Sequence, residues 1–267
     1  MDKSSIIQRN NITIQGSGKE VMLLAHGYGC NQSMWRFITP AFEQQFTIVL
    51  FDHVGSGQSD LTAYNYEKYN TLKGYADDII EICTILDLKN VTLVGHSVSC
   101  MIGLLAANKA PHLFARHIMV CPSPRYLNDE DYVGGFSAQD IQELAEALDS
   151  NYLGWSSAIT PVIMGNPDQP AFTEELKNSF CRNNPEIAKH FAKVTFGGDN
   201  RQDLPKNQIK TLILQCSSDF IAPLAVGKYV HEHTPHSKLH ILKATGHCPH
   251  LSSPQETIEA IQDFLHP

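Results

Sequence analysis

The stretch TLVGHSVSC, residues 92–100, decides the fold. Its apolar run ends in GHSVS, residues 95–99, which differs only in its last residue from the G-x-S-x-G pattern of a serine nucleophile. That pattern requires a strand before the serine and a helix after it, because the sharp turn between them exposes the hydroxyl. The segment VSCMIGLLAANKA, which follows Ser97, has the small and apolar composition of a buried helix. The stretch therefore predicts a strand, a tight turn and a helix, with Ser97 on the turn.

Ser99 stands where the pattern has its second glycine. The position needs a small side chain so that helix and strand can approach, and serine adds only a hydroxyl. The turn therefore remains feasible, provided that Ser99 does not adopt a positive φ. A packing turn of small residues without any chemistry would also fit these five letters, so the choice depends on the rest of the chain.

The segments around this stretch alternate between strand-like and helix-like patterns. Short apolar runs typical of strands buried on both faces occur at 21–25, 46–51, 91–95, 116–120 and 211–215. Apolar residues at helical spacing from Leu72 to Leu86 predict a helix, and the tail predicts a helix at 223–233, a strand at 238–242 and a helix at 254–265. This alternation predicts an α/β fold with a mostly parallel central sheet flanked by helices.

A long segment interrupts the alternation between the strands at 116–120 and 211–215. Ser137 and Asp140 match a capping box, and an apolar stripe follows them at 141–148. Asn184-Pro185 reads as the cap and first residue of another helix. The insertion is therefore predicted to be a small helical cap rather than a loop.

The composition limits the classes of function. The chain has 267 residues, 42% of them hydrophobic and 18% charged, which suits one sizeable core. A formal net charge of -8, with no cluster of basic residues, argues against nucleic-acid binding. The N-terminal residues lack the pattern of a secretory signal, the apolar runs are too short for a membrane span, and the seven scattered cysteines read as reduced thiols. We therefore expect a cytoplasmic protein that does not bind membranes.

Two further residues could complete a catalytic triad with Ser97. A serine nucleophile needs a base, and the base needs an orienting carboxylate. Asp219 closely follows the strand run at 211–215, and His247 lies in the loop after the next strand, which is the chain order serine, acid, histidine. His96 is a competing base, although side chains adjacent to each other at such a turn diverge, and neither Asp199 nor Asp203, the alternative acids, follows a strand.

Glycines after the strands at 21–25 and 46–51 suggest two further turns. The segment LAHGYG, residues 24–29, lies where an oxyanion hole would take its second N–H group, and we expect the N–H groups of Tyr28 and Val98 to form that hole. The turn FDHVGSGQSD, residues 51–60, lacks the spacing of a phosphate loop and reads as a structural turn beneath the site. His247 and His250 have no second ligand cluster at suitable spacing, so we expect no metal site, and nothing calls for a cofactor.

Taken together, these motifs resemble those of the α/β-hydrolase superfamily. The segments GHSVS, SPRYLND, YVGGF, NYLGW and GHCPH further resemble a narrower group, the RsbQ-like hydrolases of bacterial stress signalling, which are related to the plant strigolactone and karrikin receptors. VGSGQSDL and GHCPHLS look closer to the bacterial form, whereas the serine at position 99 is the one seen in the plant receptors. The resemblance spans nearly the whole chain, including the inserted cap.

The resemblance implies roles for particular residues. Ser97, Asp219 and His247 would be nucleophile, orienting acid and base, and Tyr28, which replaces a phenylalanine common in the group, would add a hydroxyl at the pocket mouth. A lid of four helices, forming a V, would occupy residues 125–196, leaving 1–124 and 197–267 as the core. The expected lining of its apolar pocket is Phe136, Trp155, Ile159, Val194, Phe196 and Phe220, although packing in the core alone would also explain these residues.

Three functions are compatible with these motifs and with the resemblance. The first is a serine hydrolase of a small hydrophobic ester or lactone that is coupled to signalling, with a phosphatase carrying a sensory domain as the partner that the resemblance implies. The second is a receptor-like ligand sensor whose hydrolysis is slow. The third is a metabolic carboxylesterase or carbon–carbon bond hydrolase that uses the same triad without a partner.

Overall fold

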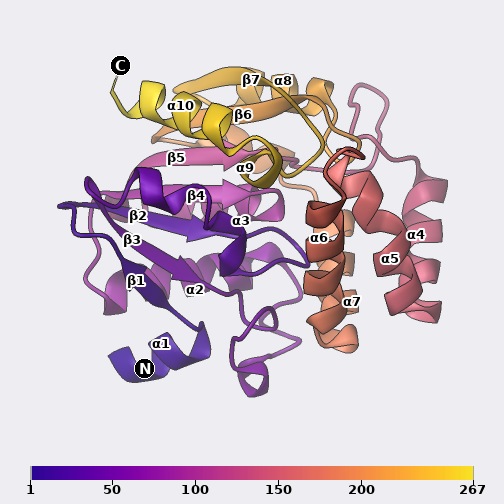
Figure 1. Cartoon of the computed structure of the whole chain (residues 1–267), viewed down its shortest axis with the longest axis horizontal. Helices are drawn as coiled ribbons and strands as arrows, with labels where there is room; N and C mark the ends of the chain where they lie inside the picture. Colours follow the sequence, from indigo (N-terminus) through magenta and orange to yellow (C-terminus); the bar gives the residue numbers. More distant parts are fainter. Residues whose placement is uncertain (1, 267) are drawn as a thin grey trace.

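The computed structural model describes residues 2–266 and is built around one seven-stranded sheet (Figure 1). The strand order is β1-β3-β2-β4-β5-β6-β7, and every neighbouring pair is parallel except β1 and β3. The strands are β1 (Thr13–Gln15), β2 (Glu20–Ala25), β3 (Phe46–Phe51), β4 (Val91–His96), β5 (Phe114–Val120), β6 (Lys210–Ser218) and β7 (Ser237–Thr245). The predicted α/β class and mostly parallel sheet are confirmed.

Helices cover both faces of this sheet. Side chains along each buried strand alternate between the two faces, so apolar residues lie on both faces and both must be covered. On β2, Leu23 and Ala25 belong to the apolar cluster that also holds residues of α2, α3 and α8, whereas Met22 and Leu24 belong to the cluster that holds residues of α10. The helices of the core are α1 (Lys3–Arg9), α2 (Leu72–Ile85), α3 (Val98–Lys109), α8 (Leu224–His233), α9 (Pro249–Ser252) and α10 (Pro254–Leu265).

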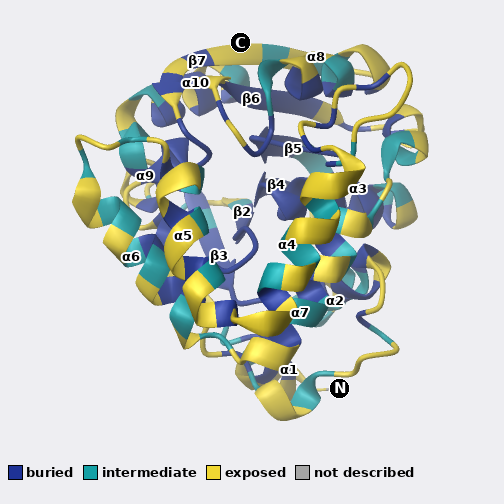
Figure 2. Ribbon diagram, turned by 90° about the vertical axis from the view of Figure 1, so that its right-hand side faces the viewer, coloured by how far each residue is buried: buried dark blue, intermediate teal, exposed yellow. Residues whose placement is uncertain are grey.

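Four more helices lie between β5 and β6 in the chain and form a separate layer beyond the sheet (Figure 1). They are α4 (Ala138–Ser150), α5 (Tyr152–Met164), α6 (Pro170–Arg182) and α7 (Pro185–Gly197), and we refer to them as the lid. The capping box of Ser137 and Asp140 starts α4, and the Asn184 side chain accepts from two N–H groups at the start of α7, as the sequence predicts. Figure 2 shows α5 and α6 on one side of this layer and α4 and α7 on the other, with the buried strand ends between them.

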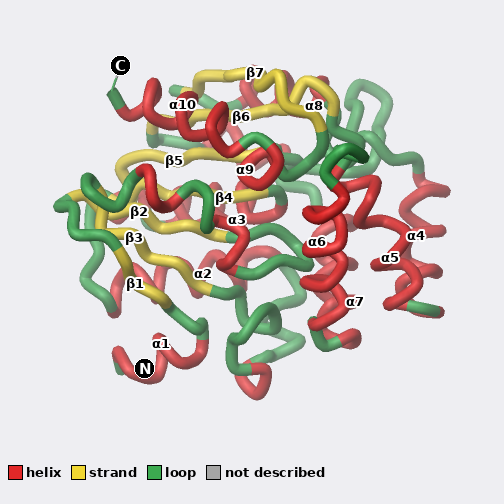
Figure 3. Tube along the Cα trace, in the orientation of Figure 1, coloured by secondary structure: helices red, strands yellow, loops and turns green. Residues whose placement is uncertain are grey.

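The lid faces the edge of the sheet at which the parallel strands end. Loops that follow these strands reach the lid helices there, as the green and red segments of Figure 3 show. Ligands of open α/β sheets bind at the carboxyl ends of the strands, so this edge is where a site is expected. Across residues 2–266, the structure contains no helix with the length and apolar character needed to span a bilayer.

Candidate active site

The turn between β4 and α3 holds Ser97 in an unusual backbone conformation. Ser97 has φ 56° and ψ -123°, a region that residues with a Cβ rarely adopt. Such strain, of order 1–3 kcal/mol, persists only where the surrounding structure enforces it, and it is common at active sites. Here β4 is buried along its whole length and the first turns of α3 are buried against it. The packing of a strand and a helix therefore fixes Ser97 on a sharp turn at the end of the strand.

Asp219 and His247 reach Ser97 from the two strands farther along the sheet. Asp219 directly follows β6, and His247 lies two residues after the end of β7. His247 Nε2 lies 2.8 Å from Ser97 Oγ, and His247 Nδ1 lies 2.7 Å from Asp219 Oδ2. All three residues are buried. The structure thus places these three residues in one hydrogen-bonded chain, which is the geometry that an activated serine requires.

The alternative base, His96, has a different environment. Its Nε2 contacts the carbonyl oxygen of His247 at 2.8 Å, and its ring packs 4.4 Å from that of His250. Burial, together with the neighbouring rings of His250 and His247, keeps the pKa of His96 well below its usual value. The alternative acids pair elsewhere, Asp199 with Arg125 and Arg201, and Asp203 with Lys206. These residues therefore do not compete with Asp219 and His247.

The loop that follows β2 lies directly against the turn of Ser97. We call residues 26–31 the oxyanion loop. A methyl group at Gly27 would lie 2.5 Å from His96 Nδ1 and 3.3 Å from Ser97 Cβ, so only glycine permits this approach. In the described part of the chain, the N–H groups of Tyr28 and Val98 have no hydrogen-bond acceptor. Both are therefore free to donate to a substrate oxygen, although their role in an oxyanion hole stays a prediction.

Ser99 ties the oxyanion loop to the core. It lies in α3 without a positive φ, so glycine is not needed at this position. Its hydroxyl donates to the carbonyl oxygen of His26 at 2.5 Å and accepts from His53 Nε2 at 2.7 Å. The His53 N–H donates in turn to His26 Nε2 at 3.1 Å. The residue that departs from the nucleophile pattern therefore fastens the loop that carries Tyr28.

This network consists of neutral groups. Burial lowers the pKa of His53 well below its usual value, with His26 adding to the effect. Burial also lowers the pKa of His26, although the nearby Asp52 carboxylate opposes the shift. Because His26 Nε2 accepts from His53, its Nδ1 carries the proton and donates to the carbonyl oxygen of Gly27 at 2.8 Å. Each hydrogen bond thus fixes the tautomer of the next ring.

The Tyr28 hydroxyl does not lie where the sequence placed it. It was expected at the pocket mouth, but it donates to the carbonyl oxygen of Ala188 in α7 at 3.0 Å. Burial is the main reason that the pKa of Tyr28 lies well above its usual value, and the neighbouring Tyr152 hydroxyl adds to the rise. A buried hydroxyl must find a partner, and the lid backbone supplies it here. The hydroxyl of Tyr28 is therefore a contact with the lid rather than a group offered to a ligand.

A narrow, mostly apolar cavity with a volume of about 30 Å³ lies between Ser97 and the lid. Four of the expected residues line it, namely Phe136, Trp155, Ile159 and Phe196. Lining residues that the sequence did not single out for the cavity are Cys30, Tyr126, Leu144, Ile163, Leu176, Phe180, Thr195, Ile221 and Cys248. Leu144 belongs to the predicted stripe of α4, so periodicity could have identified it.

Two of the expected lining residues lie elsewhere. Val194 lines a different groove, where α7 meets Leu72 and Leu105. Phe220 is 60% exposed, and its ring contacts that of Phe136 at 5.8 Å without lining the cavity. Phe220 lies outside the cavity because of the turn after β6, where Asp219 points to His247 and Ile221 reaches the cavity. The prediction was therefore wrong for both residues.

Tyr126 is a polar residue of the cavity that sequence reasoning missed, and it lies beside the nucleophile. It is buried in the loop after β5 and lines the cavity together with Ser97. Burial raises the pKa of Tyr126, and a hydrogen-bonding interaction with Ser97 partly opposes the rise. Tyr126 thus places a neutral hydroxyl beside the nucleophile. Only its position within the SPRYLND motif distinguished it in the sequence.

The lid also contacts the loop that carries His247. The His247 N–H donates to the carbonyl oxygen of Ile163 in α5 at 2.9 Å, and Asn166 Nδ2 donates to that of Thr245 at 2.9 Å. Gly246 lies between these bonds, and a methyl group there would lie 1.8 Å from the carbonyl oxygen of Met164. The end of α5 and the histidine loop are therefore packed backbone to backbone.

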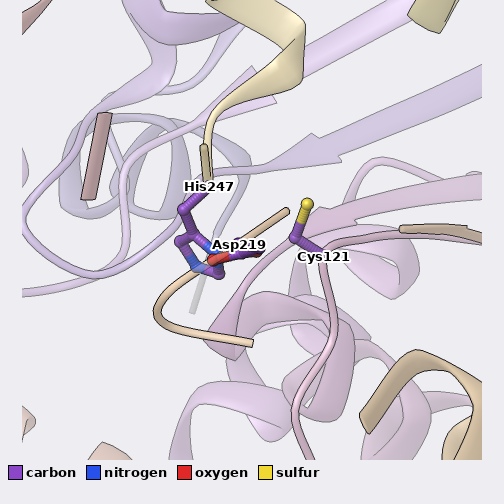
Figure 4. A group of neighbouring side chains, drawn as sticks. All are labelled: Cys121, Asp219 and His247. Atoms are coloured by element: carbon purple, nitrogen blue, oxygen red, sulfur yellow. The ribbon is translucent and has the colours of Figure 1, made fainter. Parts of the chain in front are cut away.

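Cys121, Asp219 and His247 form a group of possible metal ligands (Figure 4). Their ligand atoms lie within 4.8 Å of one another. Asp219 and His247 bond to each other, however, and the second carboxylate oxygen of Asp219 accepts from two backbone N–H groups. The Cys121 thiol contacts that of Cys216 at 3.7 Å, and burial raises the pKa of Cys121 well above its usual value. A protonated thiol is a poor metal ligand, so Asp219 and His247 suit a catalytic triad with Ser97 better than a metal site with Cys121.

Comparison with known proteins agrees with this geometry. Residues 22–260 match the model of the alpha/beta hydrolase family. The chain belongs to the alpha/beta hydrolase family, and it is a hydrolase of that fold.

The relatives are close in length to this chain. The karrikin insensitive 2 receptor CA of Petunia hybrida is 35% identical over 97% of this chain and 96% of its own length. The strigolactone esterase D14 of Arabidopsis thaliana is 34% identical over 99% of both chains. The solved structure of a hydrolase from Oleispira antarctica is 42% identical, with a TM-score of 0.97 over 100% of this chain and 98% of that one. The resemblance to the plant receptors seen in the sequence is thus confirmed.

Proposed function

We propose that the protein hydrolyses a small, mostly apolar ester or lactone through an acyl intermediate on Ser97. The observation that carries this proposal is the continuous chain of hydrogen bonds from Asp219 through His247 to Ser97, which ends at the apolar cavity. The nucleophile lies within hydrogen-bonding distance of its base, with 2.8 Å between Ser97 Oγ and His247 Nε2. In this scheme the site needs only a carbonyl carbon placed above Ser97 Oγ.

In the first half of the reaction, Ser97 Oγ attacks the carbonyl carbon while His247 Nε2 takes the hydroxyl proton. Asp219 accepts a hydrogen bond from Nδ1 and so stabilises the imidazolium that forms. The N–H groups of Tyr28 and Val98 would stabilise the negative oxygen, and one such donor is typically worth roughly 3 kcal/mol, or about a hundredfold in rate. His247 then gives its proton to the leaving oxygen as the carbon–oxygen bond breaks.

In the second half, water enters and His247 Nε2 takes one of its protons. The resulting hydroxide attacks the acyl carbon, and the proton returns to Ser97 Oγ as the acid leaves. For a lactone, the alcohol and the acid remain parts of one molecule, so the ring opens with net addition of water. Every proton transfer in this cycle uses the same nitrogen of His247.

The cavity suggests the class of substrate. Its lining is mostly aliphatic and aromatic, with Tyr126 as a hydroxyl beside Ser97, which suits a compact apolar molecule with one reactive carbonyl. The names of two relatives, a strigolactone esterase and a karrikin receptor, support a butenolide-like lactone as a candidate. The four helices of the lid, which we propose as a unit inserted at about residues 125–196, would enclose it.

Mass spectrometry of the intact protein tests this proposal. The protein is incubated with p-nitrophenyl acetate, with a butenolide ester and with a fluorophosphonate probe. We expect an acyl or phosphonyl adduct that maps to Ser97, together with release of p-nitrophenol, and no adduct on Ser97→Ala. A protein with an intact fold that shows neither turnover nor labelling at Ser97 would refute the hydrolase assignment for this site.

A second candidate function is ligand sensing with slow turnover. Its supporting observation is the similarity to a receptor over nearly the whole chain. If ligand binding alone is the output, Ser97→Ala should retain the thermal shift caused by a butenolide while losing hydrolysis. A pull-down from the native cell with wild type and Ser97→Ala, with and without ligand, would test for a signalling phosphatase as the partner.

A further inference from the structure

Two lid helices make hydrogen bonds to the oxyanion loop. In α6, Ser179 Oγ donates to the carbonyl oxygen of Gly29 at 2.8 Å, and Asn183 Nδ2, at the end of the same helix, donates to that oxygen at 3.2 Å. In α7, the carbonyl oxygen of Ala188 accepts from the Tyr28 hydroxyl at 3.0 Å. The loop is therefore bonded to the lid on both sides of the peptide that joins Tyr28 to Gly29.

Packing strengthens the connection on the lid side. The Tyr28 ring lies 5.5 Å from the ring of Phe180 and 5.6 Å from that of Phe191, both in edge-to-face contact. Ser179, Phe180 and Tyr28 are all buried, so their hydrogen bonds do not compete with water. The lid thus supplies the hydrogen-bond partners of the Tyr28 hydroxyl and the Gly29 carbonyl oxygen, which are buried away from water.

On the core side, the hydrogen bonds to this loop are made at its first residue, where the His26 carbonyl oxygen accepts from Ser99 Oγ and His26 Nε2 accepts from the His53 N–H. Within the loop, the Cys30 N–H closes a turn onto the carbonyl oxygen of Gly27 at 3.2 Å. Between these points lie Tyr28 and Gly29, whose contacts go to the lid. The core therefore fixes where the loop begins, and the lid fixes the part of it that carries the Tyr28 N–H.

We propose that Ser179 and Asn183 of the lid, together with the Tyr28 hydroxyl, are positioning residues that aim the Tyr28 N–H at the oxyanion. They touch neither the nucleophile nor the reacting carbonyl and act through the backbone of the loop. This inference rests on the proposed serine hydrolase and adds a specific point to it. The lid is part of the catalytic scaffold as well as a cover, so displacing α6 and α7 weakens stabilisation of the transition state.

The test compares Ser179→Ala, Tyr28→Phe and the double variant with wild type in steady-state hydrolysis of p-nitrophenyl acetate. We expect each single variant to lower kcat by roughly tenfold with KM within about twofold, because an oxyanion donor acts mainly on the transition state. Affinity for phenylboronic acid, which forms a tetrahedral adduct on a serine, should fall in parallel with kcat. Ser179→Thr, which keeps the hydroxyl, should restore most of the activity.

Glu175→Gln is the matched control. Glu175 lies one turn before Ser179 on α6 and forms a two-point ion pair with Arg36, with nitrogen–oxygen distances of 2.6 and 2.7 Å. This variant weakens a contact between the same helix and the core without touching the oxyanion loop. We expect its kcat per active site, measured by burst titration, to equal that of wild type even if its melting temperature falls.

The outcomes separate the two proposals. If Glu175→Gln and Ser179→Ala lower kcat equally, or if only the fraction of active sites falls, Ser179 is merely structural and the inference is wrong. The same holds if wild type turns over ester and binds the boronate while Ser179→Ala and Tyr28→Phe match it in both. If wild type itself does neither, the proposed hydrolase fails, and the inference fails with it.

Discussion

The floor of the cavity is made of strand ends, whereas its ceiling is made of helix faces. The floor carries Ser97, Asp219 and His247, each on the short segment that follows a parallel strand. The ceiling carries the lining residues of α4 to α7, each on one face of a helix. At a strand end, a single residue is in position to reach the site. On a helix face, several neighbouring residues can fill the same space.

This difference suggests a division of labour. Positions on the floor are fixed by hydrogen bonds at 2.7 and 2.8 Å, so replacing them should change the rate of the chemical step. Positions on the ceiling are fixed by packing, so replacing them should change which ligands bind. This division should fail at the hydrogen bonds between the lid and the oxyanion loop, because replacing those lid residues should change the rate of the chemical step.

The largest effect is expected from Ser97→Ala. Loss of the nucleophile should lower kcat on the order of a millionfold, as in other serine triads, with little change in ligand affinity. Ester turnover and the binding of a butenolide measured by calorimetry check the two parts. Turnover within tenfold of wild type would mean that the chemistry does not use the floor.

Ile159→Ala tests the ceiling. Ile159 lines the cavity, and removing its apolar surface should raise KM for a bulky ester by about tenfold while kcat changes by no more than about twofold. Val162 lies on the same helix and is exposed, so Val162→Ala is the matched control and should leave both constants unchanged. A fall in kcat without a rise in KM for Ile159→Ala would contradict the division between floor and ceiling.

Ser99→Ala examines the support of the floor. It removes the bond to the His26 carbonyl and leaves His53 Nε2 without its partner, which should lower stability by about 1–3 kcal/mol. We also expect kcat to fall about fivefold, because the oxyanion loop loses its attachment to the core. Urea unfolding and steady-state kinetics measure the two effects. Ser157→Ala, which removes an exposed hydroxyl bond within α5, should show neither.

The smallest effect concerns the sheet below the floor. His117 in β5 is fully buried, neither ring nitrogen has a partner within residues 2–266, and burial lowers its pKa to about 3. In the unfolded chain a histidine titrates near 6.5, so below that pH the unfolded state binds more protons than the folded state. Above about pH 7, His117 is neutral in both states and does not make the free energy of unfolding depend on pH. As the pH falls from about 6.5 toward 3, protonation of the unfolded state lowers the free energy of unfolding progressively.

His117→Leu should remove this dependence. At pH 5 the variant should gain about 2 kcal/mol over wild type in its free energy of unfolding, with a smaller difference at pH 8. Chemical denaturation at several pH values measures this. His240→Gln, at an exposed position of β7, is the control and should leave the slope unchanged. Equal slopes for His117→Leu and wild type would show that His117 is not neutral in the folded protein.

Much of the fold could be predicted because buried parallel strands leave continuous apolar runs. The runs at 21–25, 46–51, 91–95, 116–120 and 211–215 all lie within strands of the sheet. β1 escaped prediction because it has three residues, two of them exposed, and pairs antiparallel at the edge. In the lid, the caps of α4 and α7 were predicted from side chains that bond to the backbone nearby, which is a local property of the sequence.

In the site, too, features set by local pattern could be predicted, whereas contacts between distant segments could not. The placement of Ser97, Asp219 and His247 at strand ends follows from chain order and local pattern, and the structure brings them together. Val194 was misplaced because helical spacing gives the stripe of α7 but not which neighbour the stripe meets. The partners of Ser99 and of the Tyr28 hydroxyl could not be predicted, because each bond joins segments far apart in the chain.

Gly246 gives this architecture a consequence for sequence variation. It performs no chemistry, yet a methyl group there would overlap the carbonyl oxygen of Met164, and its φ is +81°. In a library of random substitutions selected for ester hydrolysis, we expect position 246 to return glycine as strictly as position 97 returns serine. Positions that tolerate no substitution should therefore include Gly246, where the lid packs against the loop that carries His247, as well as the reacting groups.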